Sequence, residues 1–191
     1  MTARFDRGYY QKYYLDSQTA AVTSAEMRAR ALLIAAYCDH IGLPVKRILD
    51  AGCGIGLLRA PLLKALPRAK YTGLEVSEYM CEQFGWVHGT IADYRPRAPF
   101  DLVVCYDVMQ YLDDREATRA LANFARLCRG VLFFSALTTY DWKHNADRTR
   151  TDPDVHYRSG EWYRERLRKR FRHIGAGFWI RRGAPLVAWE L

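Results

Sequence analysis

Short apolar runs alternate with stretches of helical periodicity along most of the chain. The runs have the length of strands, and the last two are expected to pair as a hairpin around a turn at 182–185. They lie at 45–49, 70–74, 86–88, 100–106, 130–136, 173–180 and 186–189. A helix is expected from Thr23, whose side chain can form a capping box with Glu26, to about Ile41. Strands that alternate with helices predict one α/β domain built on a mostly parallel sheet.

A glycine-rich turn follows the first expected strand. Asp50 to Gly56 read D-A-G-C-G-I-G, and a helical pattern starts immediately afterwards at Leu57. A strand, a glycine turn and a helix in this order leave backbone N–H groups at a helix N-terminus, where the polar end of a nucleotide-like cofactor can bind. Leu57 stands where the dinucleotide-binding pattern G-x-G-x-x-G needs its last glycine. The spacing therefore argues against a nicotinamide cofactor.

The segment 50–56 matches D-x-G-x-G-x-G and, with the strand before it, resembles the first motif of class I S-adenosylmethionine (SAM)-dependent methyltransferases. The resemblance covers about residues 23–191. It implies a doubly wound, seven-stranded, mostly parallel sheet with a C-terminal antiparallel hairpin, in a single α/β domain. It also implies methyl transfer from SAM, with S-adenosylhomocysteine (SAH) as the product. The compact core, in which no appended nucleic-acid domain is expected, and the aromatic-rich N-terminal segment favour a small-molecule acceptor. We expect a methyltransferase domain over 23–191, preceded by an aromatic-rich lid segment over 1–22.

Two acids beyond the turn resemble residues that hold the cofactor in this family. Glu75 follows Asp50 by 25 residues, close to the spacing at which an acid meets ribose hydroxyls in doubly wound folds. Asp93 matches the family's acid that accepts a hydrogen bond from the adenine amino group. The full set of residues that the resemblance places around the cofactor is Asp50, Gly52, Cys53, Gly54, Gly56, Leu57, Glu75, Val76, Ala92, Asp93, Tyr94, Cys105 and Tyr106.

Methyl transfer from a sulfonium is an in-line displacement, so the protein must align the acceptor and needs no nucleophile or metal of its own. We find no group of metal ligands with a suitable spacing, and no metal site is expected. His144 and His156 are the candidate bases, because a histidine with its ordinary pKa of about 6.5 accepts protons at neutral pH. Tyr13 and Tyr111 are candidates for orienting the acceptor. Arg158 is a candidate anchor for a substrate carboxylate or phosphate.

The N-terminal segment concentrates aromatic side chains. In a helix, residues spaced four apart share a face, so these rings would form one broad aromatic surface. Such a surface either closes over the cofactor and substrate as a lid or simply packs on the domain, and both interpretations stay open. The residues are Phe5, Tyr9, Tyr10, Tyr13 and Tyr14.

Charge adds a second hypothesis about the acceptor. The chain carries a net charge of +8, and the stretch 140–182 holds 12 Lys and Arg against 6 Asp and Glu. This excess favours an acidic small molecule or, as a second choice, an RNA or tRNA, whose binding would depend steeply on salt. A third alternative is a SAM-binding module without catalysis. The oligomeric state stays open.

The remaining features of the sequence concern its surroundings. No apolar run approaches the length that spans a membrane, and the first residues lack the apolar stretch of a secretory signal. The five cysteines are widely separated and form no C-x-x-C pair. A reduced, cytoplasmic setting without a membrane partner is therefore expected.

Overall fold

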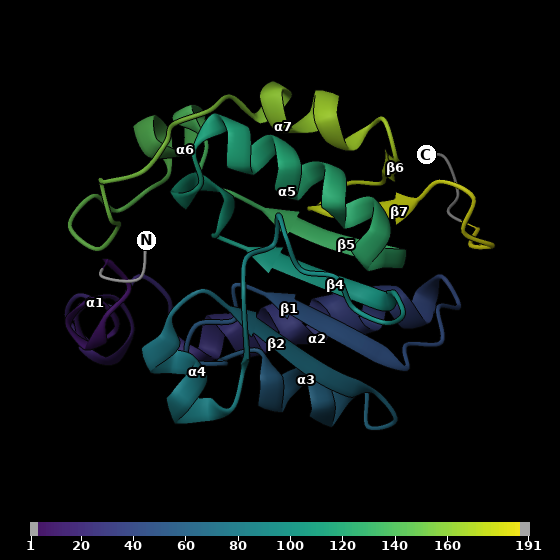
Figure 1. The fold of residues 1–191 in the computed structure, drawn as a ribbon, viewed down its shortest axis with the longest axis horizontal. Coiled ribbons are helices and arrows are strands. Elements are labelled where there is room, and N and C mark those ends of the chain that lie inside the picture. Colours follow the sequence, from purple (N-terminus) through teal and green to yellow (C-terminus); the bar gives the residue numbers. More distant parts are fainter. Residues whose placement is uncertain (1–3, 188–191) are drawn as a thin grey trace.

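The computed structural model describes residues 4–187, which form a seven-stranded sheet with helices on both faces (Figure 1). The strand order is β3-β2-β1-β4-β5-β7-β6; the first five strands in the chain run parallel, and β7 is antiparallel to both β5 and β6. The strands are β1 (Arg47–Ala51), β2 (Lys70–Glu75), β3 (Val87–His88), β4 (Phe100–Tyr106), β5 (Cys128–Ser135), β6 (Phe171–His173) and β7 (Phe178–Arg181). The predicted doubly wound α/β fold is confirmed.

Helices cover the two faces of the sheet and create two separate apolar cores. Helices α5 and α7 cover one face, and α2 and α3 cover the other (Figure 1). Strand β4 serves both, because Val103 faces the first core while Val104 faces the second. The helices are α1 (Arg7–Tyr10), η2 (Gln11–Leu15), α2 (Ser24–His40), α3 (Arg59–Ala65), α4 (Glu78–Phe84), η3 (Met109–Tyr111), α5 (Asp114–Leu127), α6 (Thr139–His144) and α7 (Gly160–Leu167).

Polar side chains set the starts of these helices. Thr23 and Glu26 form the predicted capping box at α2, in which each side chain accepts from the other residue's backbone N–H. Ser77 caps α4 by accepting from Met80 N, and Asp113 caps α5 by accepting from Glu116 N. These caps place the helix N-termini at the carboxyl edge of the sheet, beside the glycine turn.

The C-terminal hairpin is present, but the predicted position of its turn is wrong. The turn lies at 174–177 and joins β6 to β7, whereas the sequence suggested a turn at 182–185. The chain reverses there because Gly175 and Gly177 adopt φ of 93° and 83°, values that favour glycine. Of the expected second strand at 186–189, residues 186–187 are not in a strand and the others lie outside the described residues.

The order of the strands sets the place of a ligand site. Strand β1 pairs with β2 on one side and with β4 on the other, so the direction of winding reverses between β1 and β4. Ligands of open α/β sheets bind beyond the carboxyl ends of the strands at such a switch point. The helices α1, α4 and α6 lie around this edge (Figure 1).

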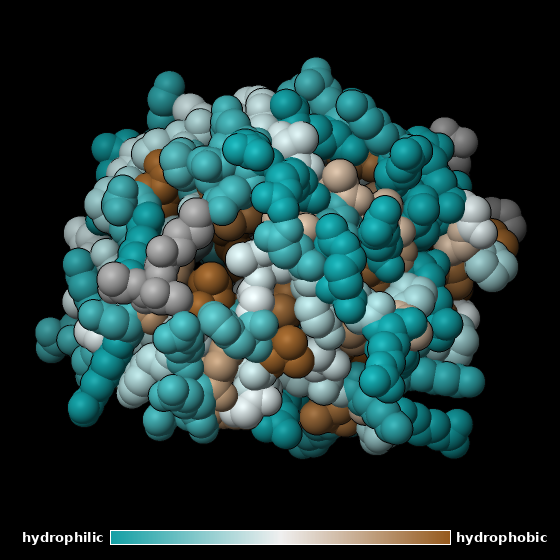
Figure 2. All heavy atoms as spheres, viewed as in Figure 1, coloured by the Kyte–Doolittle hydropathy of each residue, from teal (hydrophilic) through white to brown (hydrophobic). Residues whose placement is uncertain are grey.

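The face of the molecule in Figure 2 is mostly hydrophilic. On the face in Figure 2, hydrophobic residues are scattered among hydrophilic ones and form no large continuous patch. Among residues 4–187 no helix combines the length and the apolar character that a membrane crossing requires.

Candidate functional site

The glycine turn between β1 and α3 is closely packed from two sides. Gly52, Gly54 and Gly56 have φ of 81°, 52° and 77°, all in the left-handed region. A Cβ added to Gly52 would lie 2.4 Å from Cγ2 of Val108, and one added to Gly56 would lie 2.6 Å from Cζ2 of Trp86. The indole Nε1 of Trp86 also donates to the carbonyl of Gly54 at 2.9 Å. Gly56 therefore makes room for Trp86 and Gly52 makes room for Val108, while Gly52 and Gly54 also line the first cavity.

Glu75, the last residue of β2, is anchored to this turn. Its buried carboxylate accepts from Gly54 N at 2.8 Å through Oε2, and from Val76 N and Ser77 N at 2.8 and 3.0 Å through Oε1. Three backbone donors thus hold the carboxylate in one orientation. Each carboxylate oxygen retains further acceptor capacity, which faces the adjoining cavity.

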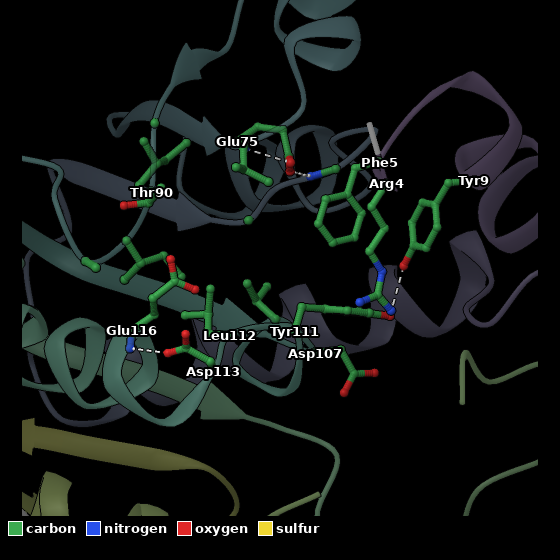
Figure 3. Close-up of a pocket in the computed structure, with 18 of the residues that line it drawn as sticks. Arg4, Phe5, Tyr9, Glu75, Thr90, Asp107, Tyr111, Leu112, Asp113 and Glu116 are labelled. Carbon is green, nitrogen blue, oxygen red and sulfur yellow. Dashed lines mark hydrogen bonds between the residues drawn. The ribbon is translucent and has the colours of Figure 1, made fainter. Parts of the chain in front are cut away.

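The first cavity lies between Glu75 and the N-terminus of α5 and has a volume of about 350 Å³. Figure 3 shows Glu75 on one side of it, Phe5, Arg4 and Tyr9 from the N-terminal segment, and Thr90 with Glu116 at the opposite end. Its apolar walls suit a flat ring, while its two ends carry hydrogen-bonding groups. The apolar wall residues are Leu74, Val76, Ile91, Ala92, Val108 and Leu112.

The second cavity adjoins the first and has a volume of about 420 Å³. The two cavities share five lining residues, so one ligand can extend from one into the other: Tyr9, Tyr14, Gly52, Asp107 and Tyr111. The second cavity reaches past the glycine turn to α6, where Asp141 lines it, and to the segment between α6 and α7, where Arg150 lines it.

The N-terminal segment lies across the glycine turn. Tyr10 is almost fully buried, and a Cβ on Gly54 would lie 3.6 Å from its ring. Tyr9 Oη donates to Tyr111 Oη at 2.9 Å, and Ser77 Oγ donates to the carbonyl of Phe5 at 2.6 Å. These contacts tie the segment to the start of α4 and to η3, and Tyr9 and Tyr111 line both cavities. Whether it opens and closes as a lid stays a prediction.

The structure brings most of the expected cofactor residues to the cavities. The residues that line one or both cavities are Asp50, Gly52, Cys53, Gly54, Leu57, Glu75, Val76, Ala92 and Tyr106. Four others line neither cavity: Gly56 contacts Trp86, Cys105 is buried in the core, Tyr94 packs against the same core, and Asp93 is exposed and paired with Arg119.

Glu116 was missed by sequence reasoning although it lines the first cavity. Its Oε2 is buried and has no hydrogen-bond partner among the described residues. A buried acceptor without a donor is costly, so this atom calls for a donor from a ligand. The sequence does not single out Glu116, because an acid three residues after the capping Asp113 is typical of an ordinary helix start.

The residues expected to act in catalysis lie in different places. Tyr13 and Tyr111 line the second cavity, and Tyr111 lines the first as well. His156 lines the first cavity, where its backbone N–H donates to the carbonyl of Gln110 at 2.8 Å. His144 is exposed at the end of α6, with its ring 4.4 Å from that of Tyr140, and lines neither cavity.

The predicted role of Arg158 as a substrate anchor is wrong. Its side chain is buried, and Nε donates to Asp114 at 2.8 Å. Its other nitrogens donate to the carbonyls of Met109 and Leu112 at 3.0 and 2.5 Å. Arg158 therefore fastens the segment after α6 to the start of α5 and has no free edge for a substrate.

Asp50 lies under the glycine turn with a shifted pKa. Burial raises its pKa from 3.8 to about 7, against a hydrogen bond from Tyr71 Oη at 2.5 Å that lowers it, and the charge of Glu75 adds to the rise. The folded state thus keeps a proton that the unfolded state releases at lower pH. Asp50 therefore destabilises the fold progressively as pH rises from about 4 to about 7.

Replacing Asp50 with Asn removes this pH dependence. An amide keeps an acceptor for Tyr71 but cannot ionise, so the variant should gain stability relative to the wild type between pH 4.5 and pH 8, by about 2–4 kcal/mol. Urea denaturation of both proteins at the two pH values measures the gain. A stability difference that is the same at both pH values would contradict the shifted pKa.

Comparison with protein-family models finds a match to the methyltransferase domain over residues 49–130. Trans-aconitate 2-methyltransferase of Azoarcus sp. strain BH72 is 32% identical over 103 residues, which are 49% of this chain and 40% of the relative. Ubiquinone biosynthesis O-methyltransferase of the same strain is 31% identical over 112 residues, covering 51% and 47%. The chain spans less than half of the length of these curated relatives.

Solved structures extend the likeness over nearly the whole chain. N-methyltransferase NodS from Bradyrhizobium japonicum WM9, in complex with SAH, has a TM-score of 0.64 at 17% identity and covers 93% of this chain and 98% of its own. Magnesium protoporphyrin IX methyltransferase from Synechocystis PCC 6803, with bound SAM, has a TM-score of 0.65 at 17% identity and covers 94% of each chain. At these identities the likeness establishes the fold.

Proposed function

We propose that the protein is a SAM-dependent methyltransferase with a small-molecule acceptor, because residues 49–130 match a methyltransferase domain model and nearly the whole chain shares the fold of solved methyltransferases. The observation that carries the proposal is the buried carboxylate of Glu75, which the N–H of the glycine turn holds beside the first cavity. Two adjoining cavities provide room for a cofactor and an acceptor side by side.

The residues present fit SAM. The first cavity would take the adenosine, with the ribose hydroxyls donating to Glu75 and the adenine amino group donating to Glu116. Gly52, Cys53 and Tyr106 lead toward the second cavity and would pass beside the methionine end. Bound SAM supplies an activated methyl group, and the chain's task is to orient the acceptor and to exclude water.

Two variants separate the acids that compete for the adenine amino group. Glu116→Gln should weaken SAH binding about tenfold, because it replaces a charged acceptor by an amide, whereas Asp93→Asn should change affinity less than twofold. Asp93 is the matched control, since its side chain faces Arg119 outside the cavity. Calorimetric titration with SAH gives both values; a larger loss for Asp93→Asn would reverse the assignment.

We keep Tyr13 and Tyr111 as residues that orient the acceptor, because both line the second cavity. His156 remains the histidine candidate for a base, and His144 is left out because it lines neither cavity. The aromatic segment before α2 is proposed to cover the bound ligands, which its position over Gly54 supports. A cytoplasmic setting remains part of the proposal; the five free cysteines support it.

The basic side chains that suggested an acidic acceptor lie mostly outside the two cavities. Of the twelve basic side chains at 140–182, all of them in the described range, Arg150 alone lines either cavity. In α7, Arg164 pairs with Glu161 and Arg166 stacks on Trp162, away from the cavities. The RNA-directed alternative draws on this same exterior surface.

Assays with methyl-labelled SAM distinguish the alternatives. A small-molecule methyltransferase should label a fraction of low molecular mass from a cell extract and should leave purified tRNA unlabelled. Labelling of tRNA that falls steeply as salt rises would favour the RNA-directed alternative. Binding of SAH without transfer to either material would favour a non-catalytic SAM-binding module.

A further inference from the structure

The second cavity is strongly acidic. Six carboxyl groups, of which Asp50 is partly protonated near neutral pH, and one guanidinium line it: Glu26, Asp50, Asp107, Asp141, Asp147, Asp152 and Arg150. Several carboxylates are held by neutral groups, which leave their charge in place; hydrogen bonds from Thr23 and from Thr149 lower the pKa values of Glu26 and Asp147. Among the ion pairs that residues 4–187 form, only that of Asp152 with Arg4, at 3.0 Å, involves one of these carboxylates. The cavity therefore attracts cations and repels anions.

The cofactor itself does not account for this charge. SAM carries one carboxylate and two positive groups, its ammonium and its sulfonium. Arg150, whose buried Nε has no partner among residues 4–187, can answer the carboxylate. Asp50 and the glycine turn lie closest to the path proposed for the methionine end. The carboxylates of Asp107 and Asp141 exceed what the cofactor needs, which leaves negative charge for a cationic acceptor.

Asp107 stands where the two cavities meet. It follows β4 with φ of 57°, an uncommon left-handed conformation for a residue other than glycine. Its Oδ1 accepts from Gln110 Nε2 at 3.4 Å, and within the described chain Oδ2 accepts no hydrogen bond. A strained backbone that holds a partly unpaired carboxylate at a shared cavity wall is typical of a functional position.

Tyrosine rings complete the cavity, contributed by residues 9, 13, 14, 106 and 111. Ring faces attract cations, and the chain's own cations already use three of them: Lys12 lies 4.8 Å from the ring centre of Tyr13, Arg30 lies 3.8 Å from that of Tyr106, and Arg4 lies 5.2 Å from that of Tyr111. Burial raises the pKa of Tyr106 to about 12 and the pKa of Tyr111 still further. Tyr106 and Tyr111 therefore stay neutral and are not the base.

We propose that the acceptor is an amine that is cationic in solution, held in the second cavity by carboxylates and tyrosine rings, and that Asp107 takes its proton. The inference rests on the proposed methyltransferase function and names the acceptor class of that same site. It favours a base that the sequence did not single out, in place of His156.

The step balances as follows in atoms and charge. The bound ammonium gives one proton to the carboxylate of Asp107 and thereby gains a free electron pair. The amine nitrogen forms a bond to the methyl carbon while the carbon–sulfur bond breaks and its electron pair stays on sulfur. The product leaves as a methylated ammonium, and Asp107 releases its proton to water.

Charge fractionation of a cell extract tests the acceptor class. Cation-exchange-retained, anion-exchange-retained and unretained small molecules are each incubated with the protein and methyl-labelled SAM. Label should enter the cation-retained fraction, and acetylation of its amines should abolish the labelling. Label that enters only the anion-retained or unretained fraction would overturn the amine while leaving the methyltransferase function intact. A protein that binds SAH and labels no fraction would overturn both.

An Asp107→Asn variant tests the proton acceptor. Its turnover on the cation-retained fraction at pH 7 should fall at least a hundredfold, with the Kd for SAH changed less than threefold. Turnover should then recover about tenfold per pH unit up to pH 9, because more of the amine is already deprotonated in solution. Asp39→Asn, an exposed substitution at the end of α2, is the control and should leave turnover unchanged.

The groups around Asp107 shift its pKa and therefore influence that pH profile. Burial raises the pKa of Asp107, while Gln110 and Arg30 lower it and Asp141 raises it. Tyr14, Tyr106 and Tyr111 also face it, and burial keeps their pKa values raised. A loss of turnover in Asp107→Asn that stays constant between pH 7 and pH 9 would indicate a structural role and overturn the assignment.

Discussion

Replacing Glu75 with Ala is expected to weaken binding of SAH at least tenfold. The carboxylate would accept hydrogen bonds from the ribose hydroxyls, and bonds to a charged group contribute about 1.5–3 kcal/mol each. Its three backbone donors hold it in place before any ligand arrives, so little ordering is needed on binding. Calorimetric titration of the wild type and the variant measures the change.

Two further measurements separate ligand binding from folding in this experiment. Loss of Glu75 also leaves the N–H of Gly54 and Ser77 without their acceptor, so the melting temperature of each variant must be recorded. Glu78→Ala is the matched control, because Glu78 is an exposed carboxylate in the first turn of α4. A folded Glu75→Ala protein that binds SAH as tightly as the wild type would remove Glu75 from the site.

Replacing Gly52 with Ala is expected to destabilise the fold by about 2–5 kcal/mol. The left-handed φ of 81° costs an L-residue about 1–2 kcal/mol, and overpacking a filled space adds about 1–3 kcal/mol. The space is filled because the new Cβ would lie 2.4 Å from Cγ2 of Val108. Urea denaturation measures the loss in free energy of unfolding.

Gly42 provides a control that isolates the backbone contribution. Its φ is 68°, yet a Cβ there meets nothing within 4 Å, so Gly42→Ala should lose only about 1–2 kcal/mol. Shortening the neighbour in the double variant Gly52→Ala with Val108→Ala should recover part of the steric loss relative to Val108→Ala alone. Equal losses for the two glycines would contradict the close approach of Val108.

Local patterns predicted the arrangement of the residues that we propose to hold the cofactor. A strand, a glycine turn and an acid at the next strand end are fixed by neighbours in sequence, and Glu75 does lie against Gly54. The capping box of Thr23 and Glu26 is equally local and was found for the same reason. The parallel core followed, because alternating strands and helices leave few ways to wind.

Features that depend on contacts between residues far apart in the chain could not be predicted from the sequence. Arg158 reaches Asp114 and two carbonyls across 44 to 49 positions, which no spacing reveals. Asp93 turns to Arg119 on α5, while Glu116 of the same helix turns into the cavity. The hairpin was misplaced because both the Gly175–Gly177 and the 182–185 segments carry turn residues, and only pairing with β5 selects between them.

The acidic lining of the second cavity could not be predicted from the sequence for the same reason. Its carboxylates come from α2, β1, the end of β4, α6 and the segment after α6, so the basic excess of the C-terminal sequence concealed an acidic interior. Net charge describes the surface of a chain and its partners at long range. The charge around a substrate is set by the few side chains that the fold turns inward.

Calorimetric titration of the purified protein with SAH, with NADH as the control, tests whether the site takes SAM. We expect micromolar binding of SAH, because Glu75 and the glycine turn are already arranged for an adenosine, and no binding of NADH. Binding of NADH in preference to SAH, or binding of neither ligand by the folded protein, would contradict the proposed cofactor and the methyltransferase function that depends on it.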